Sequence, residues 1–365
     1  MSYVLAFLGF AALIILHEAG HFAAAKAVGM RVERFSLFFG PPLVKFRRGE
    51  TEYGIGPIPL GGYVKITGMN PNEKLPAGLV ARAYYNQPPW KRIVVILAGP
   101  AVNLVIAFVL LMGIYWSQGA VVTSHGQPVS TRKVDSGPLA PPASSYLKAG
   151  DEIVAVDSKR NLPAAQITQE IASHRCAGAQ TEGCHAQAPV RLLVRRRGQL
   201  LTFSIFPRYH ASAQRVQVGF GFGVKVRPLG PVGAAGQGVS EMWYATTTTV
   251  SMIARLFEPK VRKQLHGIVA GFTVTQQRFA FDTIAALSTL ALISLSLAIV
   301  NLFPFLPLDG GHVFWALAEK VRGRRIPFAV MERAGVVGFV LVAILFVIGL
   351  SNDISTLAGK GFGVR

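Results

Sequence analysis

The sequence predicts a polytopic α-helical membrane protein with about four transmembrane helices, a membrane-associated β-hairpin and an inserted extracytoplasmic α+β domain. Of its 365 residues, 51% are hydrophobic and only 15% are charged, and the mean hydropathy is +0.41. This combination is typical of membrane proteins. Four segments are long and apolar enough to cross a bilayer, which takes about 20 helical residues. They are residues 3–28, 93–116, 283–306 and 335–350, the last extendable backwards.

The distribution of Lys and Arg predicts the orientation of these segments. The loop between the first two spans and the turn at residues 320–325 are both rich in basic side chains, whereas nothing basic precedes Tyr3. Positive loops face the cytoplasm, so both termini are expected outside. A net charge of +19 could also indicate nucleic-acid binding. No nucleic-acid motif accompanies it, so we expect no such partner and assign the charge to topology and the lipid bilayer.

Four regions follow along the chain: residues 1–116 and 283–365 as membrane halves, 117–210 as a soluble domain, and 211–282 as a linker. In the soluble domain, "DEIVAVD" alternates like a strand, and residues 189–207 predict two strands joined at Arg197-Gly198. The spacing in residues 165–174 is helical. The linker segment 239–257 predicts an amphipathic surface helix. Cys176 and Cys184 form either a local disulfide or two free thiols.

The first span contains "HEAGH", which predicts a metal site. His17 and His21 are four residues apart, so on a helix their imidazoles lie on one face and can converge on one ion. Zinc accepts neutral nitrogen ligands, and Glu18 is placed to take a proton from a water at that ion. Charged or polar groups are costly inside a span, so this trio indicates function rather than solvated surface.

A third ligand is expected at similar depth, and Asp309 in "NLFPFLPLDGGH" meets that condition. The first and third spans both run inward, with His17 and His21 in the inner half of one and Asp309 at the inner end of the other. Pro304 and Pro307 would break the helix there. The alternative role for Asp309 is an N-cap on the following helix. His312 is expected to be structural.

The chain resembles the bacterial site-2 proteases, which are zinc intramembrane metalloproteases. The matching motifs are "HEAGH", "GPIPLGGYVKITG", "AGPAVN", the insert containing "YLKAGDEIVAVDSKR", and "NLFPFLPLDGG", in the family's order and over nearly the whole chain. The resemblance implies that His17, His21 and Asp309 bind one zinc ion and that Glu18 is the general base. It also implies a PDZ-like insert, location in the bacterial cytoplasmic (inner) membrane, and a role in regulated intramembrane proteolysis.

Substrate binding is predicted around two segments. "LVKFRRGETEYGIG" predicts a β-hairpin turning at Arg48-Gly49, and the Pro and paired Gly of the following "PIPLGGYVKITG" suggest irregular backbone. We expect the hairpin and the segment from Gly61 and Gly62 through Tyr63 to Val64 to offer an edge that pairs with an unwound substrate. Asn301 either hydrogen-bonds that substrate or satisfies backbone freed by Pro304, and Asn103 is expected to pack helices.

Three function classes compete. The first is an intramembrane zinc endopeptidase that cuts single-pass membrane proteins, such as an anti-sigma factor, or signal-peptide remnants. The second is a catalytically inactive membrane PDZ scaffold, which would be expected to have lost at least one of His17, Glu18, His21 and Asp309. The third is a metal transporter, which predicts more intramembrane carboxylates and histidines than this chain has. The intact residue set favours the peptidase.

Overall fold

The computed structural model describes every residue except 71, 72, 125, 126, 136, 138, 212, 257, 264, 360, 361 and 363–365. It divides into two compact units, which are described separately. One unit combines Met1–Ser117 with Gly230–Arg365, and the other is Gln118–Leu229. The chain therefore leaves the first unit once and returns to it, as expected for an inserted domain.

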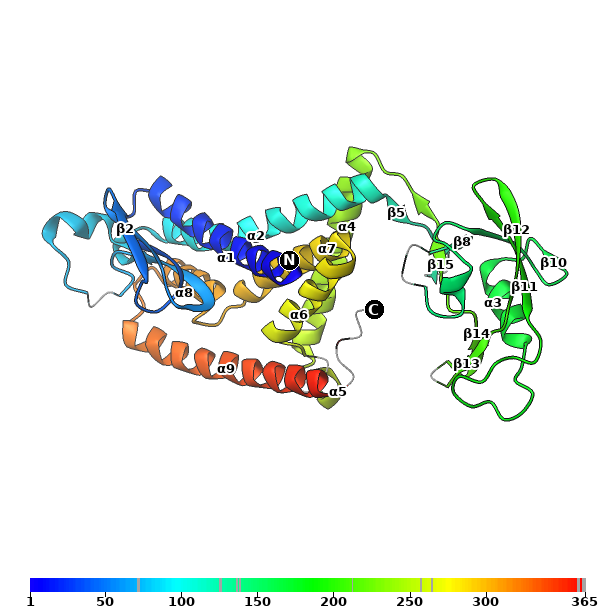
Figure 1. Cartoon of the computed structure of the whole chain (residues 1–365). Helices are drawn as coiled ribbons and strands as arrows, with labels where there is room; N and C mark the ends of the chain where they lie inside the picture. The colour runs from blue at the N-terminus through cyan, green and yellow to red at the C-terminus, as the bar shows by residue number, and fades with distance from the viewer. Residues whose placement is uncertain are drawn as a thin grey trace. The chain divides into compact units, whose positions relative to one another are not determined.

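Four helices in the described residues are long and apolar enough to cross a membrane, and they match the four predicted spans (Figure 1). They are α1 (Ser2–Ala27), α2 (Pro89–Gln118), α7 (Thr283–Asn301) and α9 (Phe328–Ala358). Small residues are buried where these helices meet: Gly20 of α1 lies against the backbone of Ala98 in α2, and Ser294 of α7 donates a hydrogen bond to the carbonyl of Asn103 in α2 at 3.0 Å. Helices pack closely in lipid where small side chains let their backbones approach.

Shorter helices fill the rest of this unit. They are η1 (Ala77–Arg82), η2 (Tyr84–Asn86), α4 (Pro231–Ala254), α5 (Pro259–Arg262), α6 (Ile268–Phe281) and α8 (Asp309–Arg322). Helix α6 packs against α1, α7 and α9. The predicted surface helix at 239–257 is part of α4, which begins earlier, while residue 257 lies outside the described residues.

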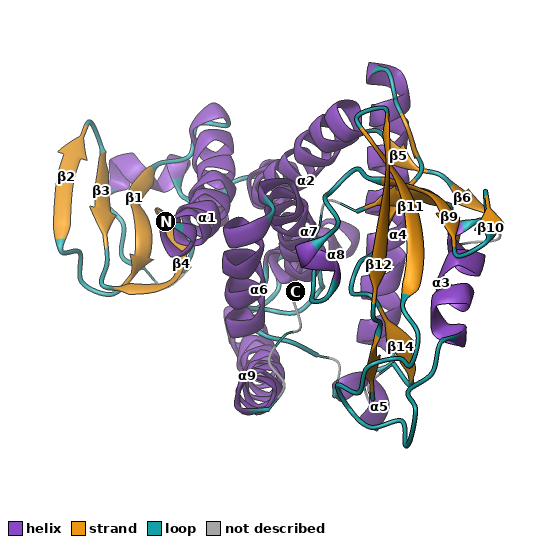
Figure 2. Ribbon diagram, turned by 45° about the vertical axis from the view of Figure 1, so that its right-hand side comes forward, coloured by secondary structure: helices purple, strands orange, loops and turns teal. Residues whose placement is uncertain are grey.

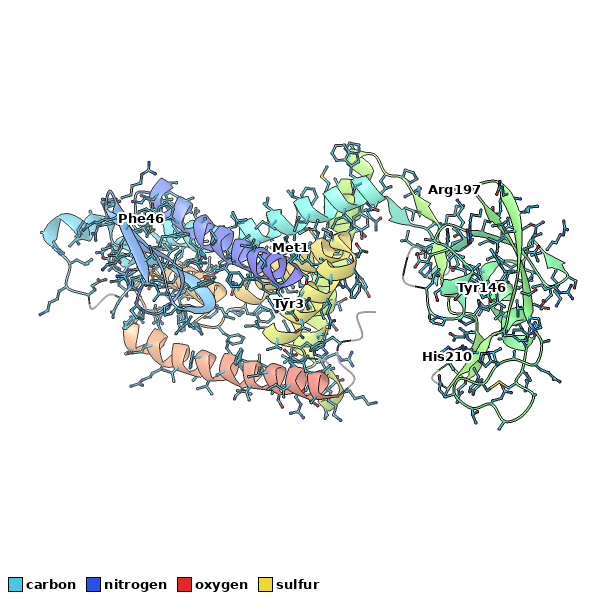
Figure 3. All side chains as sticks on the ribbon, in the orientation of Figure 1. Met1, Tyr3, Phe46, Tyr146, Arg197 and His210 are labelled. Carbon is cyan, nitrogen blue, oxygen red and sulfur yellow. A yellow bond between two sulfur atoms is a disulfide. The ribbon has the colours of Figure 1, made fainter. Side chains whose placement is uncertain are left out.

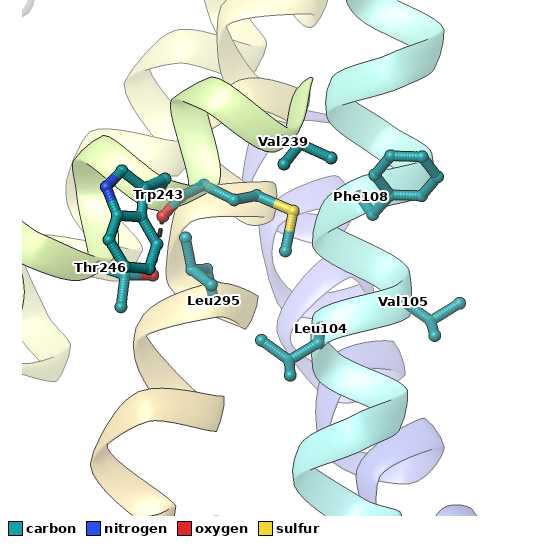
Figure 4. A pocket seen from close by; sticks show the side chains of 8 residues that line it. Leu104, Val105, Phe108, Val239, Trp243, Thr246 and Leu295 are labelled. Atoms are coloured by element: carbon teal, nitrogen blue, oxygen red, sulfur yellow. Dashed lines mark hydrogen bonds between the residues drawn. The ribbon is translucent and has the colours of Figure 1, made fainter. Parts of the chain in front are cut away.

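An apolar hollow of about 380 Å³ lies between α2, α4 and α7 (Figure 4). Its lining residues are Leu104, Val105, Phe108, Val239, Met242, Trp243, Thr246 and Leu295. None of these side chains titrates, and the one hydroxyl, that of Thr246, donates to the carbonyl of Met242 in its own helix. The hollow therefore suits hydrocarbon and is not a site for hydrolysis.

A four-stranded sheet follows α1, with β4 at the edge beside that helix (Figure 2). Its strands, in spatial order, are β2 (Val44–Arg48), β3 (Thr51–Ile55), β1 (Val32–Phe39) and β4 (Ile58–Ile66). Strands β2 and β3 pair with Arg48 opposite Thr51, so the chain reverses at Gly49 and Glu50. That this hairpin meets a membrane stays a prediction.

The prediction of irregular backbone for "PIPLGGYVKITG" is wrong in part. Most of the segment forms β4, which pairs antiparallel with β1 from Ile58 to Ile66 and has register shifts near both ends of β1. Pairing with β1 supplies backbone hydrogen bonds, which overrides the weak strand preference of Pro and Gly. Gly62 allows β4 to approach α1 closely, because a Cβ there would lie 2.9 Å from Cγ of Glu18.

An ion-pair cluster ties the tip of this sheet to α1. The carboxylate of Glu50 accepts a hydrogen bond from Lys26 Nζ at 2.6 Å and two from the Arg82 guanidinium at 2.8 Å each. These bonds, those from Arg82 above all, lower the pKa of Glu50 to about 2. The carboxylate therefore stays charged at neutral pH, and the sheet is held against the end of the helix that carries the histidines.

The inserted unit is an α+β domain, and its predicted strands and helix are present. Strand β9 (Glu152–Val156) and the hairpin of β11 (Val190–Arg196) and β12 (Gln199–Ile205) form one sheet beside α3 (Ala164–Ser173). The hairpin turns at Arg197, labelled in Figure 3, where Arg197 and Gly198 have φ of 49° and 84°. This pair of positive φ values is typical of a type I′ hairpin turn.

The remaining elements of this unit are short. They are β5 (Ala120–Val121), β6 (Thr123–Ser124), β7 (Gln127–Pro128), β8 (Ser130–Val134), η3 (Ala143–Ser145), β10 (Lys159–Arg160), β13 (Arg208–His210), β14 (Arg215–Gln217), β15 (Phe222–Val224) and β16 (Val226–Arg227). The sheet order is β12-β11-β9-β8-β15, with β10 beside β9. Cys176 and Cys184 form a disulfide. The kinship with PDZ domains stays a prediction.

The unit ends later than the sequence suggested. Residues 211–229 belong to it rather than to a linker, because β15 pairs with β8 and β16 pairs with β5. The return strands are only two or three residues long, too short to show a clear alternating pattern. The chain therefore goes back to the first strands of the unit before it re-enters the helical part.

Candidate metal centre

Two helices bring three ligand atoms to one point. His17 and His21 lie on α1, and Asp309 is the first residue of α8. The two Nε2 atoms are 3.2 Å apart, and Asp309 Oδ2 lies 3.4 Å from His17 Nε2 and 3.3 Å from His21 Nε2. Both histidines are 7% exposed. The three side chains therefore form a nearly equilateral, buried set of donor atoms.

These distances fit zinc. A tetrahedral zinc ion with bonds of about 2.0–2.1 Å holds neighbouring ligand atoms roughly 3.3–3.4 Å apart. Asp309 Oδ2 is buried and, among the described residues, has no hydrogen-bond partner. Two imidazole nitrogens and a carboxylate oxygen facing one another leave lone pairs unsatisfied unless a cation lies between them. Three protein ligands also leave one of four positions for water, as catalytic zinc sites do.

The His21 ring is fixed by α2. Its Nδ1 donates to the carbonyl of Val95 at 2.9 Å, which leaves the lone pair of Nε2 directed at the centre. The ring lies directly against Gly99: a methyl group there would come 2.6 Å from Cε1 and 2.8 Å from Cδ2 of the imidazole. Glycine is therefore the only residue type at position 99 that leaves room for the imidazole of His21.

The family of the chain follows from comparison with known proteins. The model of peptidase family M50 matches residues 5–345. "Zinc metalloprotease Rip1" of Mycobacterium tuberculosis is 30% identical, over 85% of this chain and 83% of its own length. "Putative zinc metalloprotease CA_C1796" of Clostridium acetobutylicum is 28% identical over 96% of both chains. The chain belongs to peptidase family M50. It is a membrane zinc metalloprotease of the site-2 protease type.

Glu18 of this M50 peptidase lies between the metal centre and the sheet. A Cβ built on Gly62 of β4 would come 2.9 Å from Cγ of Glu18 and 3.0 Å from the carbonyl oxygen of Ser36. The edge strand therefore passes in direct contact with the glutamate, and glycine is what permits it. The neighbouring Tyr63 accepts a hydrogen bond from Arg34 at 3.1 Å, and its ring stacks on Phe39.

The structure also places the other predicted site residues of the peptidase. Gly61 and Val64 lie in β4 with Gly62 and Tyr63, and Val64 packs against a buried cluster at the end of α1. Asn301, the last residue of α7, has its Nδ2 3.5 Å from His17 Nε2, so it lies at the metal centre. Asp309 is not the N-cap of α8; Leu308 is. His312 is not part of the three-ligand cluster found among the described residues.

Sequence reasoning missed the role of Asn103 in the peptidase. This residue is fully buried, and its Nδ2 lies 3.0 Å from His17 Nδ1, while its Oδ1 has no hydrogen-bond partner among the described residues. An amide can face the ring with either its nitrogen or its oxygen. A histidine that binds metal through Nε2 carries its proton on Nδ1 and needs an acceptor there. The four-residue spacing of Gly99 and Asn103 in "AGPAVN" was the available signal.

We expect Asn103→Leu to weaken zinc binding by about 10- to 100-fold, the range typical when a ligand loses its outer hydrogen-bond partner. Asn103→Asp keeps an acceptor at the same place and should retain or tighten the metal. Competition with a chromophoric chelator measures both affinities. If the leucine variant binds zinc as tightly as the wild type, Asn103 only packs helices.

Proposed function

We propose that this protein is an intramembrane endopeptidase that cleaves the transmembrane segments of single-pass membrane proteins or signal-peptide remnants. His17, His21 and Asp309 hold the zinc ion, and Glu18 is the general base. The observation that carries the proposal is the convergence of three ligand atoms, 3.2–3.4 Å apart, two of them from α1, an apolar helix long enough to span a membrane, and the third from the start of α8. An inactive scaffold is not favoured, because the chain retains His17, Glu18, His21 and Asp309.

Hydrolysis within a membrane needs a water that is reactive at neutral pH. Zinc, when bound, supplies a water of lowered pKa and polarises the carbonyl to be attacked. Glu18 accepts the proton of the attacking water and returns it to the leaving amine. Asn301, whose amide lies beside the metal centre, donates a hydrogen bond to the substrate backbone.

The substrate must also be unwound, because helical hydrogen bonds hide its carbonyls. Strand β4 is the edge of the sheet on the α1 side, and Gly62 within it contacts Glu18. An extended substrate that pairs with this edge would replace its lost helical hydrogen bonds and pass its backbone along the metal centre. The hairpin strand β2 is the opposite edge, so β4 rather than the hairpin is the proposed docking edge.

The proposed location is the bacterial cytoplasmic membrane, with both termini and the inserted unit outside. The basic loops support this orientation, and so does the Cys176–Cys184 disulfide, because disulfides persist in oxidising compartments. The proposed substrates include a membrane-tethered anti-sigma factor.

Metal removal tests the proposed function. In detergent, the purified protein should cleave a model transmembrane substrate, lose all measurable cleavage on treatment with a zinc chelator, and regain it when about one equivalent of zinc is restored. Quantitative mass spectrometry of the products gives the rate and the position of the cut. Cleavage that survives complete zinc removal would contradict the metal mechanism, and a cut outside the apolar segment would contradict an intramembrane one.

A substrate panel tests pairing with β4. Spans that carry Gly or Pro near the cleaved bond should be cut at least about tenfold faster than Leu-rich spans, since each backbone group released from a helix in lipid costs several kcal/mol. A matched set of soluble, unstructured peptides with the same cleavage sequences should show little difference. Equal rates for rigid and helix-destabilised spans would argue against strand pairing.

A further inference from the structure

Helix α8 is tethered at a membrane face. It follows α7 after residues 302–308 and precedes α9 after residues 323–327, and α7 and α9 are both candidate spans (Figure 1). Consecutive spans meet on the same side of the bilayer, so both ends of α8 are anchored there. Its 14 residues are about 21 Å long, and its first residue, Asp309, lies at the metal centre.

One face of α8 is fixed against the helical unit. Ala316 and Glu319 are buried on this face, and Glu319 forms an ion pair with Arg92 at the start of α2. The side chains of this pair are 4% and 7% exposed. The backbone N–H of Ile326 also donates to Glu319 at 3.3 Å. These contacts set the rotation of α8 about its own axis.

The opposite face of α8 presents an apolar stripe. Phe314, Leu317 and Val321 are three and four residues apart, and their exposed fractions are 48%, 47% and 87%. Residues at this spacing align along one side of a helix. An exposed stripe of large apolar side chains on a protein surface is typical of a site that contacts a membrane or another protein.

The exposed charge beside this stripe is positive. Lys320 and Arg322 flank it on either side, and Arg324 follows the helix. The two acidic residues between 309 and 327 are both turned inward, Asp309 to the metal centre and Glu319 to Arg92. Cations that flank an apolar helical stripe place their charge at the headgroups while the stripe enters the acyl region.

We propose that α8 binds anionic phospholipid at the membrane face, with Phe314, Leu317 and Val321 inserted among the acyl chains and Lys320, Arg322 and Arg324 on the headgroup phosphates. Two observations favour lipid over a second protein as the partner of this face. Helix α8 is connected at both ends to candidate spans, and the exposed charges beside the stripe are all positive. Because α8 begins at Asp309, the same contact holds the third zinc ligand at a fixed depth; this consequence rests on the proposed function.

Depth measurement tests the insertion. The two native cysteines form the disulfide and no other cysteine is present, so Leu317→Cys gives a single site for a spin label. In vesicles that contain phosphatidylglycerol, we expect a label at 317 to be reached by oxygen and shielded from a water-soluble nickel chelate. A label at Arg324→Cys should show the reverse. Equal chelate accessibility at both positions, or spin coupling between copies at 317, would overturn the proposal.

Lipid selectivity tests the charge. In mixed phosphatidylglycerol and phosphatidylcholine bilayers, the wild-type protein should enrich the anionic lipid around it, measured from the lipid that co-purifies. The double variant Lys320→Gln/Arg322→Gln should bind anionic lipid about tenfold or more weakly. The matched control Lys260→Gln/Lys263→Gln removes two exposed cations near α5, outside α8. Equal losses in the two variants, or no enrichment in the wild type, would overturn the proposal without bearing on peptidase activity.

Discussion

Replacing Glu18 with Gln should abolish peptide-bond cleavage while leaving zinc in place. The amide has nearly the volume of the carboxylate and fits the same space against Gly62, so the fold around α1 is kept. It cannot accept the proton of the attacking water. Removal of a general base costs about 10²- to 10⁴-fold in rate. We therefore expect cleavage of a model transmembrane substrate to fall by about 10²- to 10⁴-fold.

The zinc content of the Glu18→Gln variant distinguishes a base from a ligand. Glu18 is not among the three side chains whose ligand atoms converge on the centre. The variant should therefore bind one zinc ion per chain, as the wild type does. Loss of the metal together with activity would indicate a structural role for Glu18. Undiminished cleavage with zinc bound would contradict the mechanism.

Local patterns in the sequence account for what could be predicted. Each span is a run of apolar residues, and the ligand pair His17 and His21 needs only the four-residue spacing of one helix. Asp309 is predictable from its depth in the membrane. The third span ends at a Pro-rich break, which places the residue that follows at about the same depth as His17 and His21 in the first span. The structure has apolar helices at the four predicted spans and brings ligand atoms of His17, His21 and Asp309 to one point.

Contacts between distant segments account for what could not be predicted. Strand β4 exists because β1 pairs with it, and its Pro and Gly content gives no hint of that pairing. Residues 222–224 return to β8 across most of the inserted unit. Asn103 and His17 lie on different spans, and only the packing of α1 on α2 brings the amide to the ring. The only hint in the sequence of which face of α2 meets α1 is the four-residue spacing of Gly99 and Asn103.

Gly99 offers the sharpest test of that packing. In Gly99→Ala, the added methyl group would overlap the imidazole of His21, and the backbone of α2 cannot move away because Val95 in the same helix binds that ring. The imidazole of His21 must therefore turn. It then loses either its hydrogen bond to the carbonyl of Val95 or the position of its Nε2 at the metal centre. Overpacking of this kind costs about 1–3 kcal/mol in a well-packed core. We expect the variant to lose stoichiometric zinc and, with it, cleavage.

The same helix provides the control for Gly99→Ala. Gly113 also lies in α2, and a Cβ built there meets nothing within 4 Å. Gly113→Ala therefore gains the same helix propensity without touching the centre and should bind zinc and cleave as the wild type does. Because both variants change one glycine of one span to alanine, a difference between them isolates the contact with His21. If Gly99→Ala retains zinc at wild-type affinity, α2 does not position this ligand, and the Val95 hydrogen bond contributes nothing to the metal centre.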